Sequence, residues 1–260
     1  MNNKNVRYRK KYYITIPMTT VIGIKCIDGI AIGSNSQLTI GGDNPAKEIG
    51  FDKIFEIRKM LIACAGDTEY FEKLRSEIEK RYISEFKDIK EAADIVESSV
   101  KYIYDNYPKR DENFSEILFC ISAQNKAYLF RIDSYHCFAL EVKDFYPIGS
   151  GGVFGKYILK RVWDTNLTMI GASFVLTYVI NETTKIDQYS NPPIYIALMF
   201  KTGLISFLKR EHINIITKTL SLADKRTKSY FKNLIIKPQE STEITIEALM
   251  EKIKDEKGKV

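Results

Sequence analysis

The stretch that decides the fold runs from Thr19 to Lys25, TTVIGIK, and continues through the turn Asp28-Gly29 into residues 30–36, IAIGSNS. Both runs are rich in β-branched residues, and Asp-Gly supplies the positive φ angles of a tight turn between strands. The stretch therefore predicts a β-hairpin that begins with a hydroxyl residue. A threonine freed at the start of a chain can act as a nucleophile, because its own α-amino group, with a pKa of about 8, lies beside the hydroxyl as a base.

The order of the remaining segments predicts an α+β fold. Helical spacing of apolar residues follows Asp67, a plausible N-cap, and recurs from about Ile89, after Gly149 and from Thr168 to Ile180. Further strands are predicted at residues 53–57, 60–65, 117–121, 127–132, 137–142, 194–200 and 204–207. Strands, two helices, strands, two helices and strands is the order expected for a four-layer αββα sandwich, two antiparallel sheets each covered by a helix pair.

Length and charge favour one domain with two flanking segments. The chain has 260 residues, enough for one large core. Residues 1–18 form a basic leader without the apolar core of an export signal, residues 19–210 the domain, and residues 211–260 a charged extension. The net charge is +6, with a local excess in the leader, so we expect no nucleic-acid partner, and no apolar run is long enough for a membrane span.

The four cysteines are scattered, and there are only two histidines. None of the cysteines forms a Cys-x-x-Cys pair, so a zinc site and a Cys-His nucleophile are both poorly supported, and we expect no metal and no cofactor. Cysteines on apolar segments are typical of reduced core residues, which predicts a cytoplasmic protein.

Three short motifs accompany the Thr19 hairpin. They are Asp52-Lys53-Ile54 at the start of a strand, Gly149-Ser150-Gly151 before a helix, and Asp187 followed by Ser190 after the last helix of the domain. Taken singly, each has a commoner explanation as a surface lysine, a glycine-rich helix start or a helix-end acid. Jointly, in this order and on these elements, they resemble the proteasome β-subunit family and the related peptidase rings of bacteria.

The resemblance implies a fold of the N-terminal nucleophile hydrolase type and a role for each motif. Thr19 would be the nucleophile, and Lys53 a buried ammonium beside it that lowers the proton affinity of its hydroxyl. Ser150, Asp187 and Ser190 would hold the freed amino group by hydrogen bonds.

The resemblance also implies an oxyanion site and a substrate cleft. A backbone N–H before Gly66-Asp67 would bind the oxyanion: that of Ala63 when counted back from Asp67, or that of Cys64 if one residue is missing. The backbone of Thr39 would pair with an extended peptide. An apolar specificity pocket would be lined by Leu38, Phe51, Leu61 and Ala65, although all four residues could instead be plain core.

Two positions depart from the family pattern. Asn35 stands where the family has an acid that pairs with the lysine, and an amide accepts a hydrogen bond without neutralising the charge. Met18 precedes Thr19 where self-processing members have glycine. A translation start at Met18, followed by removal of the methionine, would expose Thr19 directly.

Two functions are compatible with these residues. The first is an N-terminal threonine peptidase that cleaves unfolded polypeptides inside a ring of β-type subunits, with α-type subunits and an unfolding ATPase as candidate partners. The second is a catalytically silent β-type subunit that builds such a ring, suggested by Asn35 and by the leader. A proteasome α subunit is disfavoured, because no amphipathic helix is predicted before Thr19.

Overall fold

The structure is a computed structural model that describes residues 19–40, 46–49, 52–82, 84–107, 115–133, 136–187 and 190–236. For residues 37–40, 46–49 and 230–236 it describes the backbone alone. The chain divides into two units, residues 1–217 and 218–260. All the elements below lie in the first unit, except the later part of the last helix.

The predicted hairpin lies at the centre of the first sheet. Its strands β1 (Val21–Lys25) and β2 (Gly29–Asn35) pair antiparallel, with Gly23 opposite Ile32. Apart from the half-buried Lys25, both strands are buried on both faces, which explains why residues 21–24 and 29–33 are continuously apolar rather than alternating. The sheet order is β10-β1-β2-β11-β12, completed by β10 (Phe145–Ile148), β11 (Ile194–Phe200) and β12 (Ile205–Phe207).

The second sheet is an antiparallel meander in chain order. Its strands are β5 (Ile54–Ile57), β6 (Met60–Ala65), β7 (Glu116–Ala123), β8 (Lys126–Asp133) and β9 (Leu140–Val142). The turn between β7 and β8 consists of Gln124 and Asn125, both with positive φ, which matches the twist of a tight hairpin.

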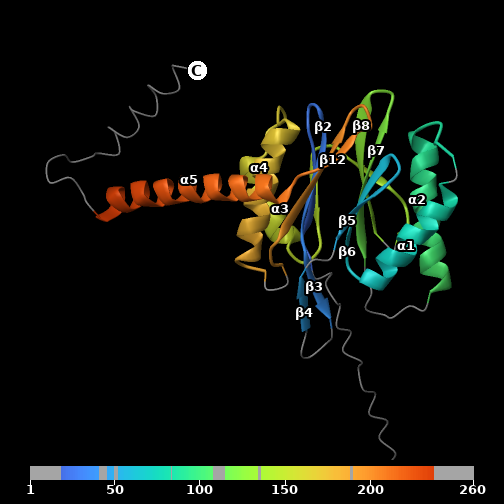
Figure 1. Cartoon of the computed structure of the whole chain (residues 1–260), viewed down its shortest axis with the longest axis horizontal. Helices are drawn as coiled ribbons and strands as arrows, with labels where there is room; N and C mark the ends of the chain where they lie inside the picture. Colours follow the sequence, from blue (N-terminus) through green and yellow to red (C-terminus); the bar gives the residue numbers. More distant parts are fainter. Residues whose placement is uncertain are drawn as a thin grey trace, which may run out of the picture. The chain divides into compact units, whose positions relative to one another are not determined.

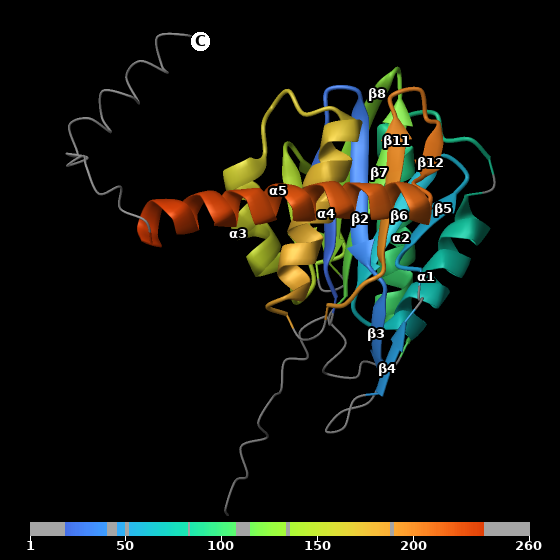
Figure 2. The same cartoon turned by 60° about the vertical axis from the view of Figure 1, so that its left-hand side comes forward.

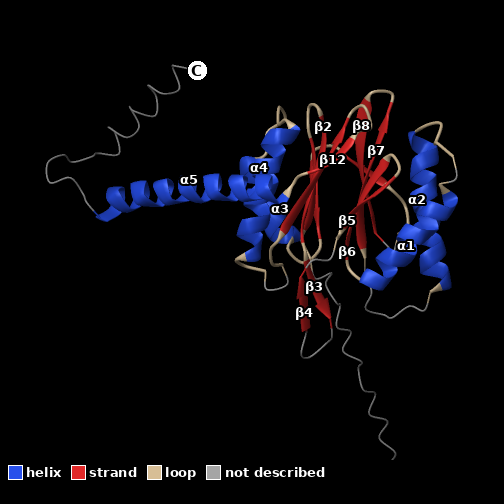
Figure 3. Cartoon of the chain, in the orientation of Figure 1, coloured by secondary structure: helices blue, strands red, loops and turns tan. Residues whose placement is uncertain are grey.

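Four helices cover the outer faces of the two sheets, as Figures 1 and 3 show. The pair on the second sheet is α1 (Thr68–Arg81) and α2 (Ile89–Asn106), and the pair on the first sheet is α3 (Gly152–Val162) and α4 (Met169–Thr184). Asp67 is the N-cap of α1, as expected, and its side chain accepts the N–H of Glu69 at 2.8 Å.

Three apolar layers hold the sandwich together. The inner layer joins the two sheets and includes Ile30, Leu61 and Leu129, while the outer layers join each sheet to its helix pair. The turned view in Figure 2 also shows the two sheets between the helix pairs. These layers confirm the α+β fold and the four-layer arrangement.

Three strands were not expected from the sequence. A hairpin of β3 (Gln37–Ile40) and β4 (Ala46–Ile49) flanks the glycine-rich connection after Ser36. The third strand, β10, contains Pro147, which disfavours a strand assignment. β10 is an edge strand of the first sheet, where one side of the backbone needs no ladder partner.

The C-terminal helix α5 (Arg210–Ile236) begins in the first unit. Ile213 and Ile216 are buried, and Ile213 belongs to the apolar layer that contains α4. The first turns of the predicted extension are therefore part of the domain core. All four cysteines are free, and Cys26, Cys64 and Cys120 are buried as expected. Among the described residues, no helix is long and apolar enough to cross a membrane.

Candidate active site

Thr19 lies at the entry to β1 and is almost fully buried, with 2% of its surface exposed. Its carbonyl oxygen accepts the N–H of Gly151 at 3.2 Å. The next carbonyl oxygen, that of Thr20, accepts the N–H of Asn35 at 3.2 Å. The backbone at the hydroxyl residue is therefore fixed from two sides, by β2 and by the loop before α3.

A chain of hydrogen bonds runs from the backbone nitrogen of Thr19 to a buried carboxylate. The Thr19 N–H donates to Ser150 Oγ at 3.1 Å, and Ser150 Oγ donates to Asp187 Oδ2 at 2.7 Å. Ser190 Oγ donates to the same oxygen at 2.7 Å and lies 2.7 Å from the Thr20 hydroxyl. The structure thus brings together Ser150, Asp187 and Ser190, the three residues expected to hold the freed amino group.

Two glycines let the loop at residues 149–151 approach this backbone. Gly149 has φ of +86°, and a Cβ atom added there would lie 2.1 Å from the carbonyl oxygen of Thr19. A Cβ atom at Gly151 would lie 1.8 Å from Thr20 Oγ1. Any larger residue must push the loop away from Thr19, and at Gly149 it would also carry a disfavoured φ.

We expect Gly149→Ala to remove turnover and to lower the melting temperature, because it adds both backbone strain and a clash with Thr19. Gly203→Ala is the matched control: Gly203 has φ of +88°, but its nearest neighbour would lie 3.6 Å from the added Cβ. The Gly203→Ala variant should lose about 1 kcal/mol of free energy of unfolding, because alanine disfavours a positive φ, and its turnover should be unchanged. Thermal unfolding and peptide turnover are measured on both variants. Equal turnover in the two would contradict the close approach.

Lys53 reaches the Thr19 hydroxyl from the second sheet. It precedes β5, is 5% exposed, and its Nζ donates to Thr19 Oγ1. Burial lowers the pKa of Lys53 to about 7, an effect that the charge of Asp187 partly opposes. The predicted pairing of an amine with the hydroxyl is thus present, with an amine that loses its charge near neutral pH.

Asn35 receives three donors on one side-chain oxygen. Its Oδ1 accepts from the Thr20 N–H at 2.8 Å, from Thr19 Oγ1 at 3.1 Å and from Lys53 Nζ at 3.3 Å. Its Nδ2 is buried and has no hydrogen-bond partner among the described residues. The position therefore uses Asn35 purely as an acceptor, a role that a carboxylate would also fill.

The expected oxyanion donors are directed into the sheet. The N–H of Cys64 donates to the carbonyl oxygen of Lys53 at 3.0 Å. Because N–H directions alternate along a strand, the N–H of Ala63 points toward β7, with which it pairs through Leu118. Both N–H groups therefore point at a neighbouring strand segment. The next N–H on the β5 side belongs to Gly66, which directly follows β6 and has φ of +135°.

A cavity of about 620 Å³ opens beside Lys53, at the edge where β5 and β12 lie. Residues from both sheets and from α1 line it: Asp52, Lys53, Ile54, Phe55, Cys64, Phe71, Glu72, Arg75, Tyr195, Phe207 and Leu208. Apolar and aromatic groups make up most of this lining, and the charged groups come from Asp52, Lys53, Glu72 and Arg75.

The structure describes only two of the four residues expected to line the specificity pocket with their side chains. Leu61 and Ala65 have no exposed surface and belong to the layer between the sheets, which favours the core alternative for both. The side chain of Leu38 and the whole of Phe51 lie outside the described residues. The backbone of Thr39 lies on β3 opposite Lys47, and its side chain is also outside what the structure describes.

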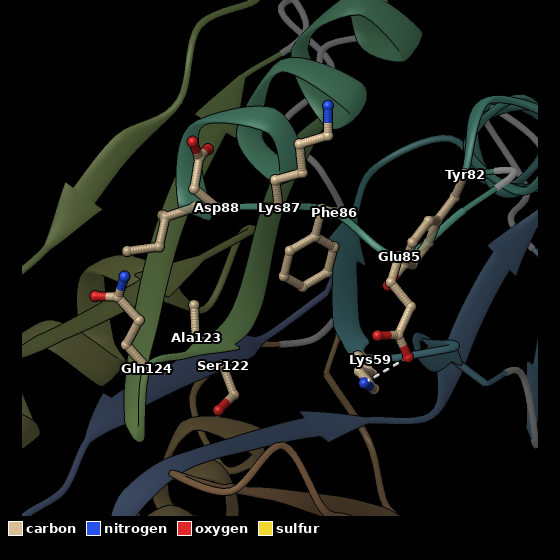
Figure 4. A pocket seen from close by; sticks show the side chains of 10 residues that line it. Lys59, Tyr82, Glu85, Phe86, Lys87, Asp88, Ser122, Ala123 and Gln124 are labelled. Atoms are coloured by element: carbon tan, nitrogen blue, oxygen red, sulfur yellow. Dashed lines mark ion pairs between the residues drawn. The ribbon is translucent and has the colours of Figure 1, made fainter.

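Another cavity, of about 230 Å³, lies at the opposite end of the second sheet (Figure 4). It is lined by the turn after β5, by the connection between α1 and α2, and by the turn after β7, and it contains an ion pair of 2.6 Å between Lys59 and Glu85. It contains none of the groups around Thr19. Within the described part of the chain, no cluster of three or more His, Cys, Asp or Glu could hold a metal ion.

Two contacts of the site were not foreseen from the sequence. The Thr20 hydroxyl bonds Ser190, and the Glu116 carboxylate accepts the N–H of Gly149 at 2.8 Å. The second hydroxyl of the Thr-Thr pair was a visible signal for the first contact. No local signal marks Glu116, because its partner lies 33 residues away, in the loop that follows β10 of the other sheet.

Comparison with known proteins agrees with this fold. Anbu from Hyphomicrobium sp. strain MC1, solved as a Gly-1 mutant, superposes with a TM-score of 0.67 at 16% identity, over 82% of this chain and 99% of that chain. Anbu (ancestral beta-subunit) from Yersinia bercovieri gives a TM-score of 0.67 at 16% identity, over 81% and 97% of the two chains. At this identity, the likeness concerns the fold. The model of the proteasome subunit family matches residues 18–199, from the residue before Thr19 into β11, and the chain therefore belongs to that family.

Proposed function

We propose that this protein is an N-terminal threonine peptidase that becomes active when Thr19 is the first residue. The observation that carries the proposal is the pair of contacts on Thr19: Lys53 Nζ donates to its hydroxyl, while Ser150 Oγ accepts from its nitrogen. A hydroxyl and the base that would take its proton thus belong to one residue; the hydroxyl is held by the buried Lys53 and the nitrogen by the half-buried Ser150.

The chemistry follows from these contacts. The α-amino group of Thr19 takes the hydroxyl proton as Oγ1 forms a bond to the scissile carbonyl carbon. Collapse of the tetrahedral intermediate breaks the C–N bond, and the same group returns the proton to the leaving amine, which leaves an ester on Oγ1. A water molecule, deprotonated by the amino group, then attacks the ester carbonyl carbon. The bond from that carbon to Oγ1 breaks, and the amino group returns the proton to Oγ1. The Lys53 ammonium favours the first step because its charge stabilises the oxygen as it loses its proton.

We assign the oxyanion contact to the N–H of Gly66 in place of that of Ala63. Gly66 is the first residue beyond β6, on the β5 side where Lys53 lies, and none of the described groups is hydrogen-bonded to its N–H. A donor that the sheet leaves unused is available to a developing negative charge.

Substrate recognition would use a strand edge and the cavity beside Lys53. β3 pairs with β4 on one edge, and no described strand pairs with the other, so an extended peptide can add there along Thr39. The largely apolar walls of the cavity, with Phe55, Phe71 and Tyr195, suit a bulky apolar side chain before the scissile bond.

Family membership supports assembly into a proteasome-like ring with other β-type subunits. The free cysteines are compatible with the cytoplasmic location that we propose for it. A site of this kind would attack any unfolded polypeptide, so enclosure in a ring would confine it. An α-type partner and an unfolding ATPase belong to the same proposal. Size-exclusion chromatography with light scattering on the native particle would detect the ring.

The second candidate, a silent β-type subunit, is favoured by one observation: an uncharged Asn35 accepts the contact of Lys53. The two functions are separated by comparing the chain that begins at Thr19 with the chain that keeps residues 1–18. Fluorogenic peptides should be cleaved only by the first, because the leader converts the basic amine of Thr19 into an amide. An inert chain with a verified Thr19 start would favour the silent subunit.

A further inference from the structure

We propose that Glu116 is a positioning residue of this site, whose carboxylate holds the loop at residues 149–151 in the conformation that binds the backbone of Thr19. The inference rests on the proposed peptidase function. It adds a residue of the second sheet to a network that otherwise reaches the Thr19 nitrogen from the first sheet and its helices.

The contacts form a short path from Glu116 to Thr19. Glu116 Oε2 accepts the N–H of Gly149 at 2.8 Å, and Gly149 has φ of +86° with its backbone against the Thr19 carbonyl. The next two residues of the loop touch Thr19 directly, Ser150 through its hydroxyl and Gly151 through its N–H. A displacement of Gly149 would therefore move both groups of the loop that contact the Thr19 backbone.

The position of Glu116 also relates the two halves of the site. It is the first residue of β7 and pairs with Ala65, the last residue of β6, immediately before Gly66. One residue thus has its backbone beside the proposed oxyanion donor and its side chain on the loop that holds the amino group. A residue so placed can set the distance between the base and the oxyanion contact.

The surroundings of Glu116 determine when its carboxylate is charged. Burial raises the pKa of Glu116, and the nearby charge of Asp133 on β8 raises it further. The N–H of Gly149 and the guanidinium of Arg131 act in the opposite direction, and Arg131 also donates to the Tyr146 hydroxyl on β10 at 2.9 Å. On β6, Glu116 faces Ala65, which carries no charge.

The test compares Glu116→Gln and Glu116→Ala in chains that begin at Thr19. Glutamine keeps an oxygen acceptor for Gly149, whereas alanine removes it. We expect Glu116→Ala to lower kcat by about tenfold to a hundredfold with little change in KM, because a misplaced base affects the reacting centre rather than ground-state binding. Glu116→Gln should restore most of kcat. Glu97→Ala is the matched control, since Glu97 Oε1 likewise accepts a backbone N–H, that of Ala139 at 2.7 Å, away from Thr19.

The pH profile and amide hydrogen exchange give two further readouts. In the wild type, kcat should fall at acid pH as Glu116 is protonated, at a pH above that of an ordinary glutamate, and Glu116→Gln should lack this acidic limb. Exchange at residues 149–151 should be faster in Glu116→Ala and unchanged in Glu97→Ala.

Two outcomes separate the inference from the function on which it rests. An active wild type with normal kcat and normal loop exchange in Glu116→Ala would overturn the positioning role. An inactive wild type, with loop exchange still accelerated in Glu116→Ala, would overturn the peptidase function while supporting the hold of Glu116 on the loop.

Discussion

Thr19→Ala should abolish peptide turnover, with kcat falling by at least about 10⁴-fold, because it removes the hydroxyl that Lys53 Nζ contacts and that would form the ester. The loss should not be a folding effect. Thr19 Oγ1 contacts Asn35 and Lys53. These two residues also share a hydrogen bond of 3.3 Å, which the substitution leaves in place. The measurement is turnover of a fluorogenic peptide by chains whose first residue is verified by sequencing.

Thr19→Ser is the control for this variant. Serine keeps the hydroxyl and the adjacent amine and removes only the methyl group, so turnover should remain measurable. Residual activity in Thr19→Ala comparable to that of Thr19→Ser would mean that the nucleophile is elsewhere.

Lys53→Met should lower kcat by about 10²- to 10³-fold with a smaller change in KM, the range typical of removing one electrostatic contact from reacting atoms. Methionine approximates the length of the lysine side chain, so the buried space beside Thr19 stays filled and the charge alone is lost. Steady-state kinetics on verified chains provide the measurement. A kcat within about twofold of the wild type would exclude an electrostatic role for Lys53.

The pKa of Lys53 sets the pH dependence of kcat. Since burial lowers the pKa of Lys53 to about 7, the ammonium is present below that pH and is lost above it, and kcat should fall on the alkaline side. Asn35→Asp places a carboxylate within reach of Lys53 Nζ, which raises the pKa and should move the alkaline limb to higher pH, with a higher kcat at pH 8. A limb that does not move in Asn35→Asp would show that another group titrates.

The fold was predictable because its signals are local. The β-branched runs around Asp28-Gly29 predict the central hairpin, and helical spacing after Asp67 predicts α1. β10 was missed because Pro147 argues against a strand, and only its place at a sheet edge, a tertiary fact, makes the proline acceptable.

The site was predictable in part for the same reason. Thr19, Lys53 and Ser150 lie on short motifs, and the structure brings them into one hydrogen-bonded cluster. The oxyanion donor must be a backbone N–H that the sheet leaves unused, and the sequence does not show which one that is before the register of β6 is known. Counting back from Asp67 predicts Ala63, whereas the pairing of β6 with its two neighbours favours Gly66. Likewise, an apolar residue on a strand can face a pocket or the layer between the sheets, and Leu61 faces the layer.

The covalent ester on Thr19 tests the central proposal most directly. A chain verified to begin at Thr19 is mixed with an excess of an activated peptide ester and quenched in acid during turnover, and the modified residue is located by tandem mass spectrometry. We expect one acyl group per active chain, on Thr19, and none in Thr19→Ala. Acylation at another residue, or none while the peptide is being cleaved, would contradict the proposal that Thr19 is the nucleophile.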